Sequence, residues 1–600
     1  MNNSGRPHIL SRNKRVELPK WVIFFDTETK EHIINESERD LTLKYGYAIL
    51  TRRRPEGTLY KVSDVEFTTL DEFYNWLDNI VVGKERYYMV AHNVAFDARV
   101  IGLFDRASRY GFKRGKFILD GLKFILEYKR GPSKLTIINN QQLFNYKLAT
   151  LGKSVGLEKM EVDFGADDFE RLKAYCKNDV EIMKVAWDKL FAYIKTNDLG
   201  NFALTTASQS LNAFRHKYMK EDIYIHHFKE PVSLERDSYH GGRTECFFIG
   251  KHEGDPIYYV DVNSMYPFVM RDGKFPTKFV HMTKGTFSYQ SFANKTDLSC
   301  IAEVKVKIDT PYLPLVKDNR LIFPTGSFTC VLADPELKEA LRRGHVREIK
   351  RAAWYTTAPI FEAYVRDLYA LRMKYKKEGD DAFEMITKNL LNSLYGKFGQ
   401  RNTTWKKVGE TTTDFLGVIY DSDVDTGRSR KLRIIDHVIE EESAIIEGTN
   451  AFPAIASFVT SYARLVLWGY IEKAGIENVL YMDTDSLFIT QAGYDRLRDD
   501  LDDHELGKLK LVGCERRMIV RAPKDYIFGE KEKIKGIRND ARVKDANSFE
   551  QDRFEGMLGA IRRGAKEGVR ITKITKTLHR DYKKGVVTSS GRVRPFALEE

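Results

Sequence analysis

The pattern of apolar and polar positions along the chain predicts a mixture of strands and helices. Short apolar runs, such as Trp21–Phe25 and the residues just before Asp261, are typical of buried strands. The segment that begins at Phe169 and residues 359–397 place apolar side chains three to four positions apart, which is typical of helices with one buried face. The stretch Ala454–Ala474 is apolar nearly all round, so we expect it at the centre of the molecule. A chain of 600 residues is too long to fold around a single hydrophobic core, so we expect several domains. The predicted fold class is multidomain α/β and α+β.

Acidic residues interrupt the apolar pattern at the end of a predicted strand. In YMDTDSLFIT, Asp483 and Asp485 lie between the strands Asn478–Met482 and Leu487–Ile489. Asp-Thr-Asp is typical of a turn, so a polar hairpin tip is one interpretation. Because buried like charges repel, a site for a divalent cation is the other. Asp261, which follows the apolar run PIYYV, would supply a third carboxylate.

A second set of acidic residues lies in the N-terminal part of the chain. It comprises Asp26 and Glu28, which share one face of an extended strand, Asp97, four residues after Asn93, and Asp179, one helical turn after Tyr175. Each pattern alone is common and is as well explained by packing. Four carboxylates and a tyrosine in this order suit hydrolysis of a phosphodiester with two metal ions, the tyrosine orienting the attacking water.

The two helices of residues 359–397 carry a further group of polar residues. Lys388, Asn392 and Tyr395 are spaced so that they share one helical face, and Arg372 lies on the preceding helix. This stripe is either an exposed helix edge or a clamp for a phosphate below a stacking surface. The glycine pair of DSYHGGRTECF indicates a tight loop in which the backbone can approach a ligand.

Composition places the chain among ordinary globular proteins, with 42% hydrophobic and 30% charged residues. No apolar run reaches the ~20 residues of a membrane-spanning helix, so we expect no membrane contact. Five cysteines without a CxxC pair argue against a zinc module or a disulfide framework and fit a reducing compartment. The location we expect is cytoplasmic, in the host cell if the protein is viral. Residues 1–20 are interpreted as a disordered basic tail, with a transit peptide as the alternative.

The net charge of +12 is concentrated near the C-terminus. Residues 516–594 hold 22 Lys and Arg against 10 Asp and Glu. Aromatic residues alternate with the basic ones, which is more typical of a surface that follows a polyanion than of a solvated basic face. We therefore expect nucleic acid to bind this stretch.

Six motifs together resemble those of the family B DNA polymerases. DVNSMYP, KNLLNSLYG and YMDTDS are similar to that family's DxxSLYP, KxxxNSxYG and YxDTDS polymerase motifs. The acids of the N-terminal part are similar to its DxE, Nx2-3(F/Y)D and YxxxD proofreading motifs. The resemblance covers most of the chain. It implies an RNase H-like 3′–5′ exonuclease domain followed by a right-hand polymerase with palm, fingers and thumb.

The resemblance also implies roles for individual residues. The catalytic residues it implies are Asp261, Asp483 and Asp485 for polymerisation and Asp26, Glu28, Asp97, Asp179 and Tyr175 for the exonuclease. Two Mg²⁺ or Mn²⁺ ions would bind in each active site, to Asp261, Val262 and Asp485 or to Asp26, Glu28 and Asp179. Residues implied to bind the nucleotide are Tyr266, Arg372, Lys388, Asn392 and Tyr395. Those implied to bind DNA are Tyr239, Gly241, Gly242, Asn93, Thr150, Leu151, Gly396, Lys524 and Tyr526.

Within the family, the chain most resembles the protein-primed polymerases of phages and linear plasmids. It is short for a family B polymerase, YHGG is similar to that branch's YxGG/A motif, and Lys524-Asp525-Tyr526 is similar to its KxY motif. Two spans leave room for the branch's insertions, one of which contacts a terminal protein that serves as primer while the other encircles the template. The predicted divisions are the tail at 1–20, the exonuclease domain at 21–198, a linker helix and the YxGG/A loop at 199–253, the palm at 254–294 and 448–537, the insertions at 295–358 and 399–447, the fingers at 359–398 and the thumb at 538–600.

Two features depart from the family pattern. The (S/T)Lx2h motif for single-stranded DNA is approximated by Thr150–Ser154, whose last residue is polar. The lysine that this branch carries between its second and third exonuclease motifs has no evident counterpart, because the stretch Lys159–Leu172 is short and acidic. We expect the exonuclease chemistry to be intact, and both departures bear on its efficiency.

Three other functions are compatible with parts of the sequence. A family B polymerase that extends ordinary nucleic-acid primers shares the catalytic motifs. A non-catalytic DNA-binding relative would not need the complete set of acids, and a stand-alone nuclease would leave residues 254–535 without a role. The sequence therefore predicts a monomeric DNA polymerase with 3′–5′ proofreading, which binds primer–template DNA and deoxynucleoside triphosphates. It would start synthesis from a terminal protein and replicate a linear viral or plasmid genome.

Overall fold

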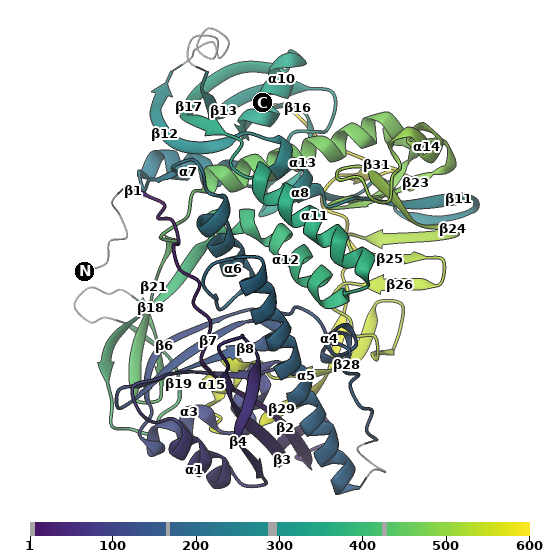
Figure 1. Ribbon diagram of the computed structural model, residues 1–600. Coiled ribbons are helices and arrows are strands. Elements are labelled where there is room, and N and C mark those ends of the chain that lie inside the picture. Colours follow the sequence, from purple (N-terminus) through teal and green to yellow (C-terminus); the bar gives the residue numbers. More distant parts are fainter. Residues whose placement is uncertain (1–6, 164–167, 286–296, 423–428, 600) are drawn as a thin grey trace.

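The computed structural model describes residues 7–163, 168–285, 297–422 and 429–599. Three large sheets and a central group of helices make up this part of the chain (Figure 1). The N-terminal part, in purple and blue, lies at one end, and the teal segment with β12 (Phe275–Lys284), β13 (Ser299–Ile308), β16 (Thr325–Ala333) and β17 (Val346–Ala358) lies at the other. The C-terminal part, in yellow, contributes strands at both ends.

The N-terminal sheet is built around the apolar strand β2 (Trp21–Ile33). Its neighbours are β3 (Glu38–Arg53), which is antiparallel, and β5 (Arg86–Ala91), which is parallel. Beyond β5 the sheet continues through β8 (Ser133–Asn139), β7 (Lys123–Arg130) and β6 (Lys113–Asp120), while β4 (Leu59–Phe67) pairs with β3.

Helices cover both faces of this sheet, which explains why β2 reads as a continuous apolar run. Successive side chains of a strand point to opposite faces. Phe24 meets Trp187 of α5 (Phe169–Thr196) edge-on at 5.6 Å, whereas Phe25 meets Phe73 of α1 (Leu70–Ile80) at 5.9 Å on the other side. The predicted helix from Phe169 is thereby confirmed, and it anchors the sheet to the rest of the molecule.

The second sheet carries the acidic hairpin of the sequence. Its order is β10 (Thr244–Cys246), β22 (Val479–Asp483), β23 (Ser486–Thr490), β11 (Gly250–Val262), β24 (Leu509–Ala522), β25 (Asp525–Phe528) and β26 (Lys531–Ile534). Alternate residues of β22 and β23 enter two different cores: Met482 and Leu487 face the large core that contains α13 (Pro453–Ala474), while Tyr481 and Phe488 face a smaller one.

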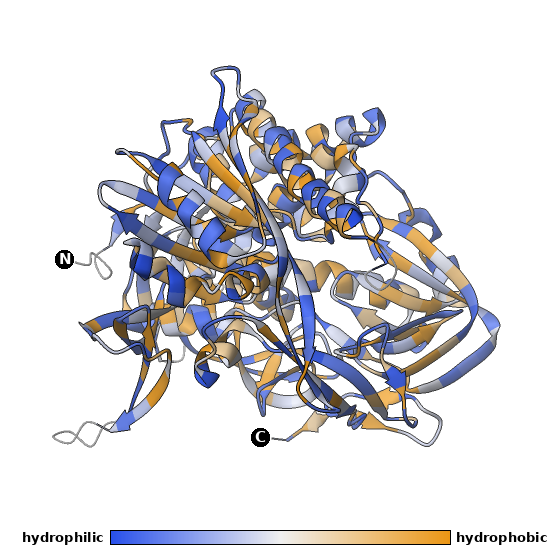
Figure 2. Cartoon of the chain, turned by 90° about the horizontal axis from the view of Figure 1, so that it is seen from below, coloured by the Kyte–Doolittle hydropathy of each residue, from blue (hydrophilic) through white to orange (hydrophobic). Residues whose placement is uncertain are grey.

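The central helices confirm the periodicity seen in the sequence. Helix α13 is buried over most of its length, as its apolar composition predicts. Among the described residues it is the one helix that is long and apolar enough to cross a bilayer, and here it lies in the protein core. Two antiparallel helices, α11 (Glu362–Glu378) and α12 (Asp381–Phe398), pack beside α8 (Met265–Asp272) and α13. In Figure 2 the long helices carry adjoining apolar and polar stripes, as expected for helices that are buried on one side.

A third sheet forms the end of the molecule opposite the N-terminal sheet. Its order is β1 (His8–Ile9), β9 (Tyr224–Ile225), β12 (Phe275–Lys284), β17 (Val346–Ala358), β13 (Ser299–Ile308), β16 (Thr325–Ala333) and β32 (Ala597–Leu598). Helix α10 (Asp334–Arg342) joins it to α13 through a buried ion pair in which Glu336 accepts two hydrogen bonds from Arg464, at 2.8 and 2.9 Å.

A smaller four-stranded sheet lies against the N-terminal sheet. It comprises β18 (Arg401–Glu410), β21 (Val438–Glu447), β20 (Ser429–Ile435) and β19 (Gly417–Ser422). The carboxylate of Glu440 accepts hydrogen bonds from both Arg433 of the same sheet and Arg114 of β6, each at 2.9 Å. All three side chains are almost fully buried, so this contact fixes the small sheet on the N-terminal domain.

The structure differs from the sequence prediction at the two ends of the chain. Of the predicted tail, the first six residues lie outside the described residues, but His8 and Ile9 form a strand on β9 and Leu10 is buried, so the predicted disorder is wrong for this part. The predicted thumb is divided between sheets: β29 (Val569–Thr577) pairs with β3 of the N-terminal sheet, and β32 pairs with β16. These pairings join segments that no local pattern connects.

Two further differences concern boundaries. Strand β2 does not end at Phe25 but continues through both acids to Ile33. Strand β12 already belongs to the third sheet, although it precedes the predicted boundary at 294/295, and that boundary itself lies outside the described residues.

Candidate active sites

The acids of the N-terminal part come together beside β2, near the end of its neighbour β5. Asp26 and Glu28 are two residues apart on β2, and between them the Thr27 hydroxyl donates to Asp97 Oδ1 at 2.7 Å. Asp97 lies on the short helix α2 (Val94–Val100), which begins after Asn93 in a left-handed conformation, φ 72°. The side chain of Asn139 accepts the Asn93 backbone N–H at 3.0 Å and so holds this turn at the end of β5. The structure thus brings together residues that the sequence separates widely.

These carboxylates are buried close to one another, and nearby positive charge does not offset their mutual repulsion. Burial and the charge of Asp179 raise the pKa of Glu28 to about 8, and burial raises the pKa of Asp97 to about 7. The pKa of Asp26 is raised well above its ordinary value by burial and by the charge of Asp97. An all-oxygen donor set that repels itself in this way fits a hard divalent cation such as Mg²⁺ or Mn²⁺.

A lysine from the short acidic stretch Lys159–Leu172 lies at this site. Lys159 forms an ion pair with Asp179, and its Nζ lies 3.9 Å from the ring centroid of Tyr175. The three residues come together because Lys159 follows the turn after α4 (Leu148–Val155), which packs on α5. Its position just before an acidic stretch hid it in the sequence. Spacing alone could not identify it, since the chain folds back to reach α5.

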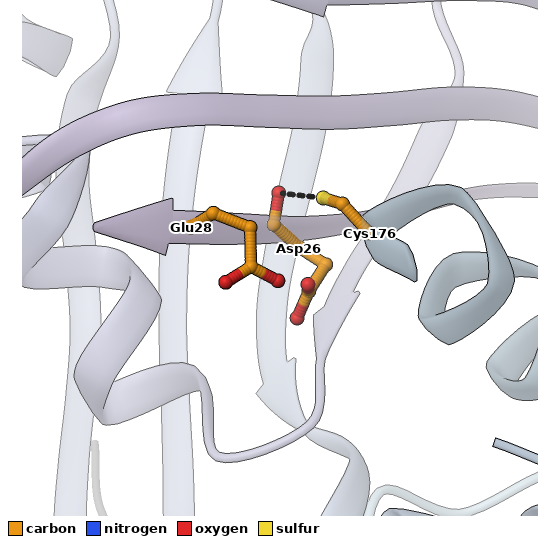
Figure 3. A group of neighbouring side chains, drawn as sticks. All are labelled: Asp26, Glu28 and Cys176. Carbon is orange, nitrogen blue, oxygen red and sulfur yellow. Dashed lines mark hydrogen bonds between the residues drawn. The ribbon is translucent and has the colours of Figure 1, made fainter. Parts of the chain in front are cut away.

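Cys176 lies beside the same carboxylates, but its thiol forms a hydrogen bond with the protein backbone rather than serving as a metal ligand. The ligand atoms of Asp26, Glu28 and Cys176 lie within 4.8 Å of one another. Figure 3 shows the thiol directed at the main-chain oxygen of Asp26, to which it donates at 3.4 Å, while both carboxylates point away from it. Burial raises the thiol pKa well above its ordinary value, which disfavours the thiolate that a metal would need.

The residues predicted to bind single-stranded DNA have different surroundings. Thr150 is exposed on α4, whereas Leu151 is buried in the core, so Leu151 can act only by placing this helix. Nearby, the Tyr146 hydroxyl donates to Asn389 of α12 at 3.3 Å and links the N-terminal domain to the helical hairpin. No local pattern in the sequence indicates this contact.

The second set of acids meets at the end of β11. Asp261 is the partner of Ser486 on β23 and of Lys510 on β24, and the Val262 backbone N–H donates to the main-chain carbonyl oxygen of Asp485 at 2.8 Å. Thr484 adopts φ 66° at the tip of the hairpin, which turns the chain between the two aspartates. The side chain of Val262 is buried, so that its carbonyl is the group able to reach a metal. The predicted trio of aspartates is therefore assembled by strand pairing.

Positive charges surround this trio without neutralising it fully. Burial and the charge of Asp261 raise the pKa of Asp485 to about 6. Lys510 lies 3.2 Å from Asp261, and Lys524 lies 3.4 Å from Asp483. Three carboxylates and a backbone carbonyl at one strand end are a donor set that fits two divalent cations.

The glycine loop before β10 packs directly on the acidic hairpin. A Cβ on Gly242 would lie 2.8 Å from Thr484 Cγ2 and 2.9 Å from the Tyr266 hydroxyl, so this position requires glycine. A Cβ on Gly241 would meet nothing within 4 Å. Arg464 of α13 donates to the carbonyls of His240 and Gly241 at 3.0 and 3.1 Å, a contact that the sequence reasoning missed. The ring of Tyr239 lies on Gly399, where a Cβ would come within 2.5 Å.

The residues predicted to bind the nucleotide lie on three helices that pack together, Tyr266 on α8, Arg372 on α11 and the other three on α12. The rings of Tyr266 and Tyr395 are stacked with centroids 4.9 Å apart. Lys388 and Asn392 are exposed on α12, and Lys388 makes no ion pair with a described residue. Gly396 follows Tyr395 with open space around it, so no packing explains this glycine.

Lys524 and Tyr526 belong to the strand β25 and its preceding turn. Lys524 has φ 64°, and its backbone N–H donates to the Tyr481 hydroxyl at 2.9 Å. The ring of Tyr526 packs on Tyr481 and Phe488, at 5.3 and 5.2 Å between centroids. Lys533 of β26 also reaches Asp483, at 3.8 Å, and lies over the Tyr526 ring at 5.6 Å. A second lysine, not predicted from the sequence, thus joins the same cluster.

A cavity of about 880 Å³ lies between the small sheet, β6 and the C-terminal helix α15 (Met557–Arg563). Its lining is rich in basic side chains, namely Lys116, Lys123, Lys397, Arg401, Lys407, Lys431, Arg433 and Arg562. Burial, followed by the charges of Lys123 and Lys116, lowers the pKa of Lys397 to about 8. Trp405 adds an aromatic ring to the wall.

Comparison with known proteins agrees with this arrangement. The family model for DNA polymerase type B, organellar and viral, matches residues 103–472, which is more than half of the chain. A probable DNA polymerase of Neurospora intermedia is 28% identical over 338 residues, which cover 54% of this chain and 33% of that protein. The DNA-directed DNA polymerase of Enterobacteria phage PRD1 is 26% identical over 466 residues, 76% of this chain and 75% of its own. This chain thus spans about a third of the length of the Neurospora relative and three quarters of the PRD1 one.

The fold is also similar to a solved structure. Phi29 DNA polymerase complexed with single-stranded DNA has a TM-score of 0.67 at 18% identity, covering 94% of this chain and 100% of that chain. The likeness confirms the predicted fold, an exonuclease domain followed by a right-hand polymerase. With the family model matched over its central residues, the chain belongs to the organellar and viral type B DNA polymerases.

Proposed function

We propose that this protein is a DNA-templated DNA polymerase with a 3′–5′ proofreading exonuclease, and that it starts synthesis from a terminal protein. The observation that carries the proposal is the presence of two complete acid clusters on separate sheets, Asp26 with Glu28 and Asp261 with Asp485. Each cluster has its own basic residue at hydrogen-bonding range, Lys159 in the first and Lys510 in the second. Membership of the type B family supports nucleotidyl transfer as the reaction.

In the polymerase site, each side chain has a defined task. Two Mg²⁺ ions, held by Asp261, Asp485 and the Val262 carbonyl, would supply the charge that activates the primer hydroxyl and stabilises the leaving pyrophosphate. Lys388 and Arg372 bind the triphosphate of the incoming nucleotide. Tyr266, supported by the stacked Tyr395 ring, lies under the sugar and excludes a 2′-hydroxyl.

In the exonuclease site, Tyr175 and Lys159 are the groups that can act on water and on phosphate. The acids Asp26, Glu28 and Asp179 would hold the metal ions, while the Tyr175 hydroxyl orients the attacking water. Lys159 lies against both Asp179 and Tyr175, so its ammonium can donate to an oxygen of the scissile phosphate as charge develops there.

Replacing Lys159 with alanine should slow degradation of single-stranded DNA by about 100-fold, the usual effect of removing one preorganised donor to a developing oxyanion. Primer extension should be unchanged, because the residue lies on the exonuclease domain. The rate of release of labelled 3′-terminal nucleotides measures the effect. Lys84→Ala, an exposed lysine just before β5 and at the end of that strand opposite Asn93, is the matched control. A Lys159 variant that degrades DNA as fast as this control would contradict the role.

Single-stranded template is the occupant we propose for the basic cavity. Its lysines and arginines suit a phosphate backbone, and Trp405 offers a surface on which a base can stack. The buried contact of Glu440 with Arg114 and Arg433 closes one wall of the cavity by joining the small sheet to β6. This arrangement supports the proposal that the inserted sheet surrounds the template and couples synthesis to strand displacement.

Replacing Lys524 with alanine should weaken the hold on the primer end. Lys524 reaches Asp483 at the active site, so its loss should lower polymerisation and raise net degradation at low nucleotide concentration. The slope of log affinity for duplex DNA against log salt should flatten by about one contact. Titration of nucleotides against a labelled primer–template measures the concentration at which synthesis overtakes degradation. Lys531→Ala, an exposed lysine of β26, serves as control, and an unchanged crossover in the Lys524 variant would exclude the primer grip.

Priming by a terminal protein rests on the two inserted sheet units and on the loop and lysine–tyrosine motifs. The test is incubation of the protein with its candidate terminal protein, one labelled nucleotide and Mg²⁺. A covalent protein–nucleotide adduct is the expected product. Incorporation of the labelled nucleotide into annealed oligonucleotide primers alone would instead favour the alternative function, a polymerase that extends ordinary nucleic-acid primers. We further propose that the protein acts as a monomer in the cytoplasm, of the host cell if it is viral.

A further inference from the structure

An acidic residue lies on the helix face that we assign to the incoming nucleotide. Glu384 precedes Lys388 by one turn of α12 and Asn392 by two turns, so the three side chains share one stripe. A nucleoside triphosphate is strongly anionic, and a free carboxylate in this stripe would oppose its binding. The presence of Glu384 there therefore needs an explanation that the proposed function does not give.

The structure shows what this carboxylate does. Glu384 Oε1 accepts a hydrogen bond from Arg372 Nε of α11 at 2.7 Å, so the two helices of the hairpin are joined by an ion pair. Arg372 Nη1 donates in turn to the hydroxyl of Ser264 at 2.9 Å. Ser264 has φ 50° and is the third residue after Asp261, at the start of α8. Arg372 thus spans the two helices and the end of the catalytic strand.

The pair is partly enclosed rather than solvated. Arg372 and Glu384 expose 16% and 21% of their side chains, whereas Lys388, one turn away, is exposed. A partly buried charge pair with good geometry is ordered more strongly than a surface pair. The arginine side chain is long and rotamer-rich, so an anchor at Nε and Nη1 removes much of its freedom before the substrate arrives.

The points of attachment leave the phosphate-binding end of the guanidinium available. The planar guanidinium has five N–H donors in a fixed fork. Glu384 engages the inner Nε, Ser264 engages one of the Nη1 protons, and Nη2 makes no hydrogen bond to a described residue. The charge of Glu384 is meanwhile offset by the arginine that it holds, so its cost to an anionic substrate is reduced.

We propose that Glu384 is a positioning residue for nucleotide binding, which holds Arg372 so that its outer N–H groups face the triphosphate. The inference rests on the proposed polymerase function. It predicts a specific pattern: loss of Glu384 affects nucleotide binding through Arg372, and has no effect once Arg372 is absent. The opposite hypothesis is that Glu384 inhibits nucleotide binding by competing with the triphosphate for Arg372, so that its removal would tighten nucleotide binding.

Single-nucleotide incorporation on a primer–template decides between them. Glu384→Ala should raise the KM for the nucleotide about tenfold and change kcat by less than about twofold, because a charge-assisted hydrogen bond that orients a ligand is lost. Glu384→Gln, which keeps an acceptor oxygen, should recover part of the loss. Arg372→Ala should raise KM at least as much, and the double variant should be no worse than Arg372→Ala alone.

Two controls separate positioning from a general structural effect. Glu378→Ala removes an exposed acid at the end of α11, whose ion pair with Lys374 is 3.9 Å long, and should leave KM unchanged. Degradation of single-stranded DNA and the melting temperature of Glu384→Ala should match the unmodified protein. A fall in KM, an unchanged KM, or additive losses in the double variant would each overturn the positioning role while leaving the polymerase function intact. Absence of incorporation by the unmodified protein would instead overturn the proposed function itself.

Discussion

Replacing Asp485 with alanine should abolish nucleotide addition, by about a thousandfold or more, while 3′–5′ degradation continues. Asp485 lies at the tip of the hairpin beside Asp261, and its carboxyl pKa is raised to about 6 by burial and by that neighbour. Removal of a ligand from a two-metal site forfeits several kcal/mol of charge stabilisation, which corresponds to such a factor in rate. Primer extension with all four nucleotides measures the loss.

The geometry also says what this variant should retain. Asp26 and Glu28, the acids proposed for the exonuclease, lie on a different sheet, so release of nucleotides from single-stranded DNA should keep its normal rate. Duplex binding should also persist, since Lys524 and the basic C-terminal residues are unchanged. Asp495→Ala, an exposed aspartate on the helix α14 (Gln491–Arg496) that follows the same hairpin, is a suitable control. Polymerisation above a trace in the Asp485 variant would refute the assignment of the metal site.

The reverse separation is expected when Asp26 and Glu28 are both replaced with alanine. Proofreading should disappear, by a comparable factor, and mispaired 3′ ends should persist in the products, because both acids of the β2 edge are lost. Synthesis on a matched primer should be unaffected. The excision rate of a mispaired labelled primer terminus, measured without nucleotides, gives the effect directly.

This double variant also has a stability signature whose sign can be derived. In the folded protein the Glu28 pKa is about 8, against an ordinary value of 4.5, so between these pH values the folded state keeps a proton that the unfolded state has released. Stability of the metal-free protein therefore falls as pH rises through this window, and removal of the acid relieves the cost. At pH 8 in a chelator, the variant should melt at a temperature equal to or above that of the unmodified protein. A clearly lower melting temperature, together with loss of synthesis, would show that the acids act in folding rather than in catalysis.

The sequence by itself determined the central helices and the position of the acids on their strands. The central position of α13 follows from its length and from apolar residues nearly all round it. Helices α11 and α12 follow from apolar spacing, because a buried stripe with a period of 3.6 residues is typical of a helix with one buried face. The acids Asp26 and Glu28 were expected on one strand face for the same reason, since the strand period is two. Local periodicity is a property of neighbouring residues, and it can be read without the fold.

The tertiary structure decided which distant segments meet. Lys159 forms an ion pair with Asp179, Arg464 donates hydrogen bonds to the glycine loop, and β29 pairs with β3. Each of these contacts depends on the path of the chain between the partners, and many paths satisfy the same local pattern. Glu384 is the clearest case: in sequence it is one more acid on a charged helix, and only the crossing of α11 over α12 places it on Arg372. Which side chains pair across two elements depends on how the whole surfaces of those elements pack together. The local sequence of one segment does not specify that packing.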